Sequence, residues 1–278
     1  MGVTTNSVFH FTWQKSTFSK ILLDGGFKMK YCGEEHHLNT GKFEGAVPMV
    51  SFCDIPFSKA EEHLDKYGFF GIGLSKDWAL KNKLNPVMYV EKFSIFASML
   101  EPYLVDTLNK DKYGGIEKKF HLENLENGKH RVSVIDDKGR AINIDATIAL
   151  LSFFKNRNGN LIRKKGKLIP NYNFYDEREW RYVPTYDEFE SNKLSYTPFL
   201  MPKEFQEYSK RPIEQRFLPN LLLKFHSNDI DYLIVKTEKD IPITIKQLRM
   251  HKKLYSTEDE LNILYTKLVS SKRLLRDV

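Results

Sequence analysis

Cysteine is scarce in this chain, and no segment of it has the pattern of a membrane or secretion signal. Only Cys32 and Cys53 occur among 278 residues, which leaves no disulfide framework and no four-cysteine zinc site. The longest apolar runs have the length of strands, well short of the roughly 20 residues of a membrane helix. The first residues lack a charged segment followed by an apolar one, so no signal peptide is indicated. We therefore expect a soluble, cytoplasmic protein that does not associate with membranes.

The glycine and histidine patterns do not match common nucleotide or metal motifs. Gly71 and Gly73 have a GxG spacing, but no third glycine opens a helix after them, so the dinucleotide fingerprint fails. His36 and His37 lie near Cys32 without the ligand spacing of a zinc site. No Walker motif is present. We expect no metal site, and ATP hydrolysis by a Walker-type site has no support.

What the chain does contain is a moderate positive charge and many aromatic residues. Lysine and arginine outnumber aspartate and glutamate by 43 to 36, and there are 20 phenylalanines and 14 tyrosines. This excess favours anionic partners such as nucleic acid or nucleotides without requiring one. The most basic stretch runs from Lys155 to Lys167, with six cationic residues and no acidic one. It is either a solvated loop or a segment that grips nucleic-acid phosphates.

Short strands of mixed spacing with helices between them predict an α+β fold rather than a regular βαβ array. Alternating β-formers predict the first strand over 7–12, and Gly25 with Gly26 ends the helix that follows. Ser58 is the expected cap of a helix over 58–67, and Ser75 of a helix over 76–84. The other predicted strands are 47–53, 69–74, 87–90, 177–184 and 231–235, with a hairpin over 130–144. The other predicted helices are 93–108, 145–155 and 257–274.

The segment FYDEREWRYVP (174–184) carries the densest mixture of acidic, basic and aromatic residues. Glu177 and Glu179 are two residues apart, so on a strand both face the same side. Two carboxylates on one face repel unless a polar or cationic group lies between them, and a ligand site can supply one. The pattern fits either an exposed strand with paired surface charges or a short strand on which Glu179 lines a ligand cleft.

Two earlier strands hold further candidates for ligand contacts. On the first strand, His10 and Thr12 point the same way, with Phe11 between them. His10 is either a histidine satisfied by one hydrogen bond at a sheet surface or, together with Thr12, a ligand contact. On the strand that ends in VSFCD, Ser51 is a candidate polar contact and Phe52 a candidate stacking face.

Three segments resemble the AbiGi family, named from the lactococcal AbiG abortive-infection system. They are VFHFT…ILLDGGF, then VPMVSFCDIPFSKAEEHLDKYGFFGIGLSKDWALKNKLNPVMYV, which is the most specific, and FYDEREWRYVP. The similarity covers nearly the whole chain. It implies a role in anti-phage defence as an antitoxin partnered with a nucleotidyltransferase-like toxin. An antitoxin needs an exposed interface, and the apolar stretch over 199–225 with the last helix is a candidate for it.

A more distant resemblance is to the ADP-ribosyltransferase fold, a split mixed sheet with flanking helices. Four features occur in a similar order. They are a His-x-Thr strand, a helix ending in ILxxGG, a second strand with Ser or an aromatic residue, and a late strand with Glu. The resemblance implies that His10 and Thr12 contact NAD and that Ser51 or Phe52 supports the nicotinamide pocket. No tyrosine stands at that second position, and Tyr67 is the possible substitute.

The same resemblance implies roles for the late carboxylates. Glu179 would contact the nicotinamide ribose and stabilise its positive charge, and Glu177 would orient or deprotonate the acceptor. NAD would be the substrate, and a nucleic acid or a protein the acceptor.

The sequence is therefore expected to form a single domain over 1–278, with a ligand-binding core over 1–186 and a C-terminal extension of a strand and helices over 187–278. Two hypotheses remain open for it. The first is an ADP-ribosyltransferase-like toxin, and the alternative is a non-enzymatic antitoxin that binds its cognate toxin. A nuclease is not supported, because no cluster of acidic metal ligands can be assembled.

Overall fold

The computed structural model describes residues 5–39, 42–56, 60–108, 120–124, 130–135, 139–162 and 168–275. The predicted cap Ser58 and residues 163–167 of the basic stretch lie outside these ranges. None of the described helices has both the length and the apolar character needed to cross a bilayer.

Nine strands within the described residues form one mixed sheet, in which β2 and β3 make a long hairpin. The order is β14-β2-β3-β1-β4-β15-β16, with β13 paired to β3 and β5 paired to β13. The bounds are β1 Ser7–Thr12, β2 Gly26–His37, β3 Lys42–Cys53, β4 Phe70–Ser75, β5 Asn85–Pro86, β13 Glu179–Tyr182, β14 Phe217–Lys224, β15 Ile230–Val235 and β16 Leu268–Ser270.

Smaller sheets and helices surround this sheet. Their strands are β6 Met88–Val90 with β10 Phe154–Asn156, β11 Asn158–Ile162 with β12 Leu168–Asn173, and β7 Phe120–Asn124, β8 His130–Ile135 and β9 Ala141–Asn143. The helices are α1 Lys15–Asp24, α2 Ala60–Tyr67, α3 Lys76–Lys81, α4 Ile95–Leu108, α5 Asp145–Phe153, α6 Tyr186–Ser191, α7 Pro202–Lys210, α8 Asp240–Met250, α9 Glu258–Thr266 and α10 Ser271–Leu274.

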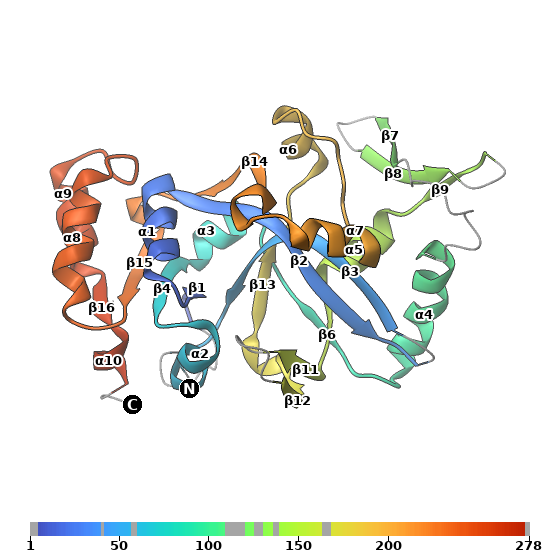
Figure 1. The fold of residues 1–278 in the computed structure, drawn as a ribbon, viewed down its shortest axis with the longest axis horizontal. Helices are drawn as coiled ribbons and strands as arrows, with labels where there is room; N and C mark the ends of the chain where they lie inside the picture. Colours follow the sequence, from blue (N-terminus) through green and yellow to red (C-terminus); the bar gives the residue numbers. More distant parts are fainter. Residues whose placement is uncertain are drawn as a thin grey trace.

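Two hydrophobic clusters hold these layers together. The larger one packs α1, α3, α8 and α9 against β1, β3, β4 and β15, and it contains Phe18, Phe52, Trp78 and Leu261. The second packs α4 and α5 against the β2–β3 hairpin around Phe154. The helices that carry the two clusters lie at different ends of the molecule in Figure 1, with α8 and α9 beside α1 at one end and α4 at the other. Because β3 runs from one end to the other, its residues belong to both clusters.

The α+β fold class with a mixed sheet is confirmed, and so are the helix ends that depend on single residues. Gly25 ends α1 in the left-handed conformation with φ of 64°, which glycine adopts without steric cost. The Ser75 hydroxyl accepts a hydrogen bond from the Trp78 amide at 3.1 Å and caps α3. The predicted hairpin is present as the antiparallel pair β8–β9.

The C-terminal third differs most from the sequence prediction. The single helix expected over 257–274 is two helices, α9 and α10, separated by β16, which pairs in parallel with β15. Strands β2 and β14 and helix α8 were not predicted. The stretch 199–225 was expected to supply an exposed interface, but β14 pairs with β2 and its neighbours Phe199 and Phe225 are buried. Much of the apolar content of this stretch therefore lies in the core, while Ile213 stays 44% exposed.

Candidate functional site

The predicted acidic strand β13 lies directly beside β3, which fixes the faces of its side chains. Trp180 pairs with Phe52, and Arg181 pairs with Ser51. Opposed residues of an antiparallel pair share a face and neighbours alternate, so Ser51, Glu179 and Arg181 lie on one face. Trp180 and Phe52 lie on the other face, where Phe52 is part of the larger core.

Glu179 is buried and receives hydrogen bonds from three side chains. The Ser51 hydroxyl donates to its Oε1 at 2.7 Å, and the Arg181 Nε donates to the same oxygen at 2.8 Å. The Lys155 ammonium donates to Oε2 at 3.0 Å. The amide of Glu179 also donates to the Tyr89 hydroxyl at 2.8 Å. A buried carboxylate is stable only with such partners, and Glu179 has them from the chain itself.

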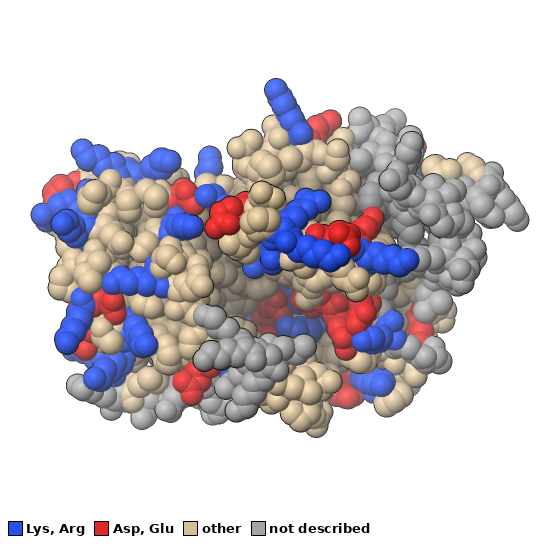
Figure 2. All heavy atoms as spheres, viewed as in Figure 1, with Lys and Arg blue, Asp and Glu red and all other residues tan. Residues whose placement is uncertain are grey.

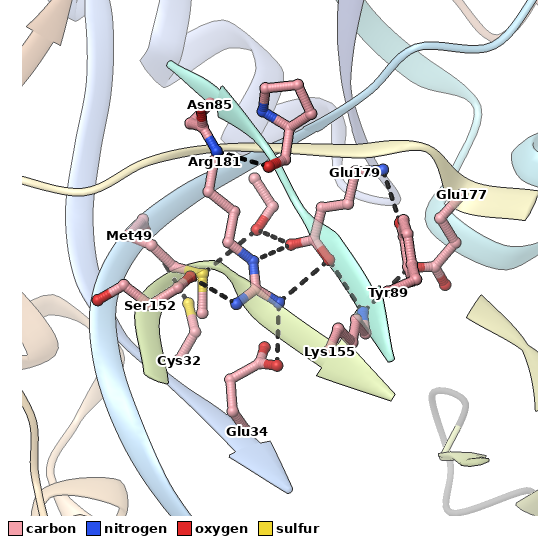
Figure 3. A network of polar contacts seen from close by, with 12 residues as sticks. Cys32, Glu34, Met49, Asn85, Tyr89, Ser152, Lys155, Glu177, Glu179 and Arg181 are labelled. Carbon is pink, nitrogen blue, oxygen red and sulfur yellow. Dashed lines mark hydrogen bonds and ion pairs between the residues drawn. The ribbon is translucent and has the colours of Figure 1, made fainter. Parts of the chain in front are cut away.

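Arg181 is fully buried and connects Glu179 to one other strand and a helix. Its guanidinium makes a 2.9 Å ion pair with Glu34 on β2 and donates to the Ser152 carbonyl on α5 at 2.8 Å. Figure 3 shows the guanidinium between Glu34 and Glu179, with the Lys155 amino group on the far side of Glu179. The planar guanidinium, with its five donors, is suited to satisfy several buried acceptors at once.

Glu177 extends the network to α2. Its Oε2 accepts a hydrogen bond from the Lys155 ammonium at 3.1 Å, and its Oε1 accepts one from the Tyr67 hydroxyl. Glu177 ends a short 3-10 helix over Phe174–Glu177, and Arg178 then adopts the left-handed conformation with φ of 45°. This local bend, uncommon for a non-glycine residue, lets both carboxylates reach one ammonium group.

Lys155 lies on β10 and supplies the cation between the two glutamates. Its ammonium is also 4.4 Å from the centre of the Phe174 ring. The sequence predicted that two carboxylates on one face require a polar or cationic group between them, and the chain provides this group itself. The sequence placed Lys155 in a basic stretch that is either a solvated loop or a contact to nucleic-acid phosphates. The structure instead places it in a buried ion pair, so it is not available to a phosphate.

The two carboxylates have opposite pKa shifts. Burial by itself would raise the pKa of Glu179, but Arg181 and Lys155 outweigh burial and hold this pKa far below its usual range. Burial raises the pKa of Glu177, and Lys155 offsets this only in part. Glu179 therefore stays ionised, while Glu177 binds a proton more readily than an ordinary glutamate does. Carboxyl pairs with separated pKa values are suited to act as an acid and a base.

Three carboxylates and two cations make up the network, and it reaches the surface at its edge. The side chains of Lys155 and Glu34 keep 17% and 14% of their exposure. Figure 2 shows a hollow near the centre of this face, below α7, in which acidic and basic side chains gather. Among the described residues, no group of three or more His, Cys, Asp or Glu side chains is arranged to hold a metal ion.

His10 lies on the opposite face of the sheet from Glu179. Phe9 and Glu179 both pair with Cys53, from its two sides. The side chains of Phe9 and Glu179 therefore point the same way, and His10, one residue further, points the other way. The expectation that His10 and Glu179 converge on one pocket is wrong.

The His10 ring is enclosed by aromatic side chains instead. It packs edge-on against Phe27 and Phe52, at 5.0 and 5.8 Å between ring centres, and its Nδ1 lies 2.9 Å from the Ser51 carbonyl oxygen. Burial lowers its pKa. The sequence left two alternatives open for His10. This environment fits a histidine satisfied by one hydrogen bond better than it fits a ligand contact. Phe52 is equally enclosed and does not face Glu179.

Phe11 and Thr12 occupy the two faces of β1. Phe11 stacks on Phe9 at 5.9 Å, and a Cβ at Gly71 would lie 2.6 Å from the Phe11 ring. A Cβ at Gly73 would meet the Phe9 ring at the same distance. The GxG pattern thus allows two aromatic rings to lie flat against β4. Thr12 shares the face of His10, as the sequence predicted, and is remote from Glu179.

Of the predicted site residues, the structure brings together Ser51, Tyr67, Glu177 and Glu179. Sequence reasoning missed Arg181 as their partner, although its spacing of two from Glu179 on a strand indicates a shared face. It also missed Glu34, Tyr89 and the true position of Lys155. These three come from distant segments, and no local pattern identifies them.

Comparisons with known proteins agree on one family. A family model described as "Putative abortive phage resistance protein AbiGi, antitoxin" matches residues 26–236. The abortive phage resistance protein AbiGi of Lactococcus lactis subsp. cremoris is 29% identical over an alignment of 222 residues, and the alignment covers 71% of this chain and 74% of that protein. No solved structure matches, so the likeness to ADP-ribosyltransferases stays a prediction. The residues of the network all lie within the matched range.

Proposed function

The chain belongs to the AbiGi family of abortive phage resistance proteins, and from this premise we propose that it acts as an antitoxin that binds and neutralises a toxin partner. The description of the family model supports this role. The partner implied by the resemblance is a nucleotidyltransferase-like toxin. Neutralisation by binding requires an exposed surface suited to a protein, and most large apolar side chains of the stretch 199–225 are buried or half-buried.

The observation that carries the proposal is the apolar surface of α4 and the turn before it. Phe93, Ile95 and Met99 are exposed by 71%, 82% and 73% of their surface, and Phe96 by 43%. The opposite side of α4 packs into the second core cluster through Ala97 and Leu104. A helix that is apolar on both sides is expected to be covered on both sides. Exposed apolar patches of this kind are typical of protein interfaces.

The buried network supports the same role. The hydrogen-bond partners of Glu179 and Arg181 come from within the chain, as in a structural core, and neither side chain requires a substrate to be satisfied. Its ion pairs join β2, β10 and β13, and a hydrogen bond from Arg181 to the Ser152 carbonyl adds α5. The network therefore stabilises the part of the fold that carries α4.

Growth of bacteria provides the test. The chain expressed alone is expected to be harmless, and co-expressed with the nucleotidyltransferase-like toxin of the same system it should restore growth. The double variant Ile95→Asp/Met99→Asp is expected to lose this rescue, because two interface anchors are worth about 2 kcal/mol or more, or about 30-fold in affinity.

The matched control is Leu80→Asp. Leu80 is 62% exposed on α3, so the same substitution is made at an apolar surface position away from α4. This variant should rescue growth as the wild type does. Equal rescue by both variants would exclude α4 as the toxin-binding surface, and toxicity of the chain expressed alone would exclude the antitoxin role.

A second candidate function is NAD-dependent ADP-ribosyl transfer. It is favoured by the contact of Ser51 with Glu179 and by the opposite pKa shifts of Glu177 and Glu179. In this reaction the bond between ribose and nicotinamide breaks and its electrons leave with nicotinamide. The acceptor atom then bonds to the ribose carbon, and Glu177 takes the proton of the acceptor. Glu179 stabilises the positive ribose. His10 has no part in this version, since it lies on the other face.

Labelled NAD separates the two functions. Wild-type protein is incubated with labelled NAD and with RNA, DNA and protein acceptors, in parallel with Glu179→Gln. A transferase releases nicotinamide and labels an acceptor, and the variant loses both activities. If the wild type neither consumes NAD nor transfers label, the transferase hypothesis fails while the antitoxin hypothesis stands.

A further inference from the structure

The end of α8 and the turn after it carry an unusually basic surface. Residues 246–253 contain Lys246, Arg249, Lys252 and Lys253 and no acidic residue, and all four side chains are exposed. Lys246 and Arg249 are three residues apart on α8, so they lie on one side of the helix. Among the described residues, no carboxylate forms an ion pair with these lysines. Figure 2 shows basic side chains gathering at this end of the molecule, where Figure 1 places α8 and α9.

This surface borders an open cavity of about 540 Å³ between α8 and α9. Arg249 and Lys252 line it together with the Tyr255 ring and the polar residues Ser256 and Thr257. The Tyr255 hydroxyl donates to the Arg249 carbonyl at 3.0 Å, which fixes the ring beside the cations. The lining contains one acidic residue, Glu258, at the start of α9.

We propose that this surface binds single-stranded nucleic acid, with the cations contacting phosphates and Tyr255 stacking on a base. A basic groove with an aromatic platform is the arrangement that binds single strands without reading sequence. Charge complementarity favours a polyanion, because the four cations lie within eight residues and a phosphate chain engages several at once. The inference does not depend on the proposed function. It places the nucleic-acid contact at residues 246–255 and not in the basic stretch 155–167.

The probes are a fluorescently labelled 20-nucleotide RNA and the DNA of the same sequence. Each is tested as a single strand and as a duplex, and binding is measured by fluorescence anisotropy. Wild-type protein is expected to bind the single strands. Four phosphate contacts, at a slope of about 0.7 each, make the affinity fall about 50-fold between 50 and 200 mM salt. The triple variant Lys246→Gln/Lys252→Gln/Lys253→Gln is expected to lose most of this affinity and this salt dependence.

A second triple variant, Lys81→Gln/Lys203→Gln/Lys224→Gln, removes the same net charge from exposed positions on other elements. It should bind as the wild type does, which separates the surface from the overall charge. Tyr255→Leu tests stacking, and it should weaken binding about fivefold or more while leaving the salt slope unchanged. Equal loss in the two triple variants, or no binding by the wild type at 50 mM salt, would overturn the proposal. Binding of duplexes alone would overturn the assignment to single strands.

Discussion

Replacing Arg181 by methionine is the most severe test of the buried network. The guanidinium has no solvent exposure, and it makes two contacts with Glu179, one with Glu34 and one with the Ser152 carbonyl. Methionine keeps much of the volume and removes all four contacts. Removing one member of a buried ion pair typically costs about 3–5 kcal/mol, because the partner charge stays buried without compensation. We expect Arg181→Met to lose about 4 kcal/mol, a large part of the 5–15 kcal/mol of a typical domain.

Urea unfolding at pH 7, followed by circular dichroism and by tryptophan fluorescence, measures this loss. The double variant Arg181→Met/Glu179→Leu removes both charges of the pair, and it should be less destabilised than the sum of the two single variants by about 1 kcal/mol or more. A loss below about 1 kcal/mol for Arg181→Met would show that water solvates Glu179 and Glu34. The description of the network as desolvated would then be wrong.

Two further predictions concern the pH dependence of stability. Burial raises the pKa of Glu177, so its contribution to stability is present at low pH and is lost as the pH rises above about 4.5. Glu177→Gln should therefore gain stability relative to the wild type between pH 4.5 and 7 in urea unfolding, and a constant difference would contradict this. Burial lowers the pKa of His36 to about 3, so the wild type should lose about 1.4 kcal/mol per pH unit from pH 6.5 down to 3. His36→Leu should have a shallower acid limb in thermal unfolding, and an unchanged limb would refute this assignment.

Much of the fold could be predicted because it depends on local signals. Strand β1 is rich in β-forming residues, α1 ends at the left-handed Gly25, and Ser75 caps α3. Each of these features is decided by a few adjacent residues. The sequence predicted that Glu177 and Glu179 lie close together, but the reason it gave was wrong. The strand begins only at Glu179, and the left-handed Arg178 after a 3-10 helix, not an extended chain, brings both carboxylates to one ammonium group.

The rest of the site depends on pairings between distant segments. The sequence does not show that β1 and β13 meet β3 from its two sides, and this pairing decides that His10 and Glu179 face apart. Lys155 belongs to a stretch that looks like a solvated basic loop, yet β10 places it between two glutamates. Tertiary pairing overrides local composition at both positions. The sequence predicted a helix at β16 because helical sequence flanks its three residues on both sides.

The parallel pairing of β15 with β16 has a consequence for biosynthesis. β4 acquires its outer neighbour β15 only after residue 235 has been made, and β16 follows more than thirty residues later. Until then the nascent chain leaving the ribosome carries an open strand edge, which is a site for misassembly and for chaperone capture. A chain truncated before residue 268 would therefore keep the outer edge of β15 open and lack the completed sheet.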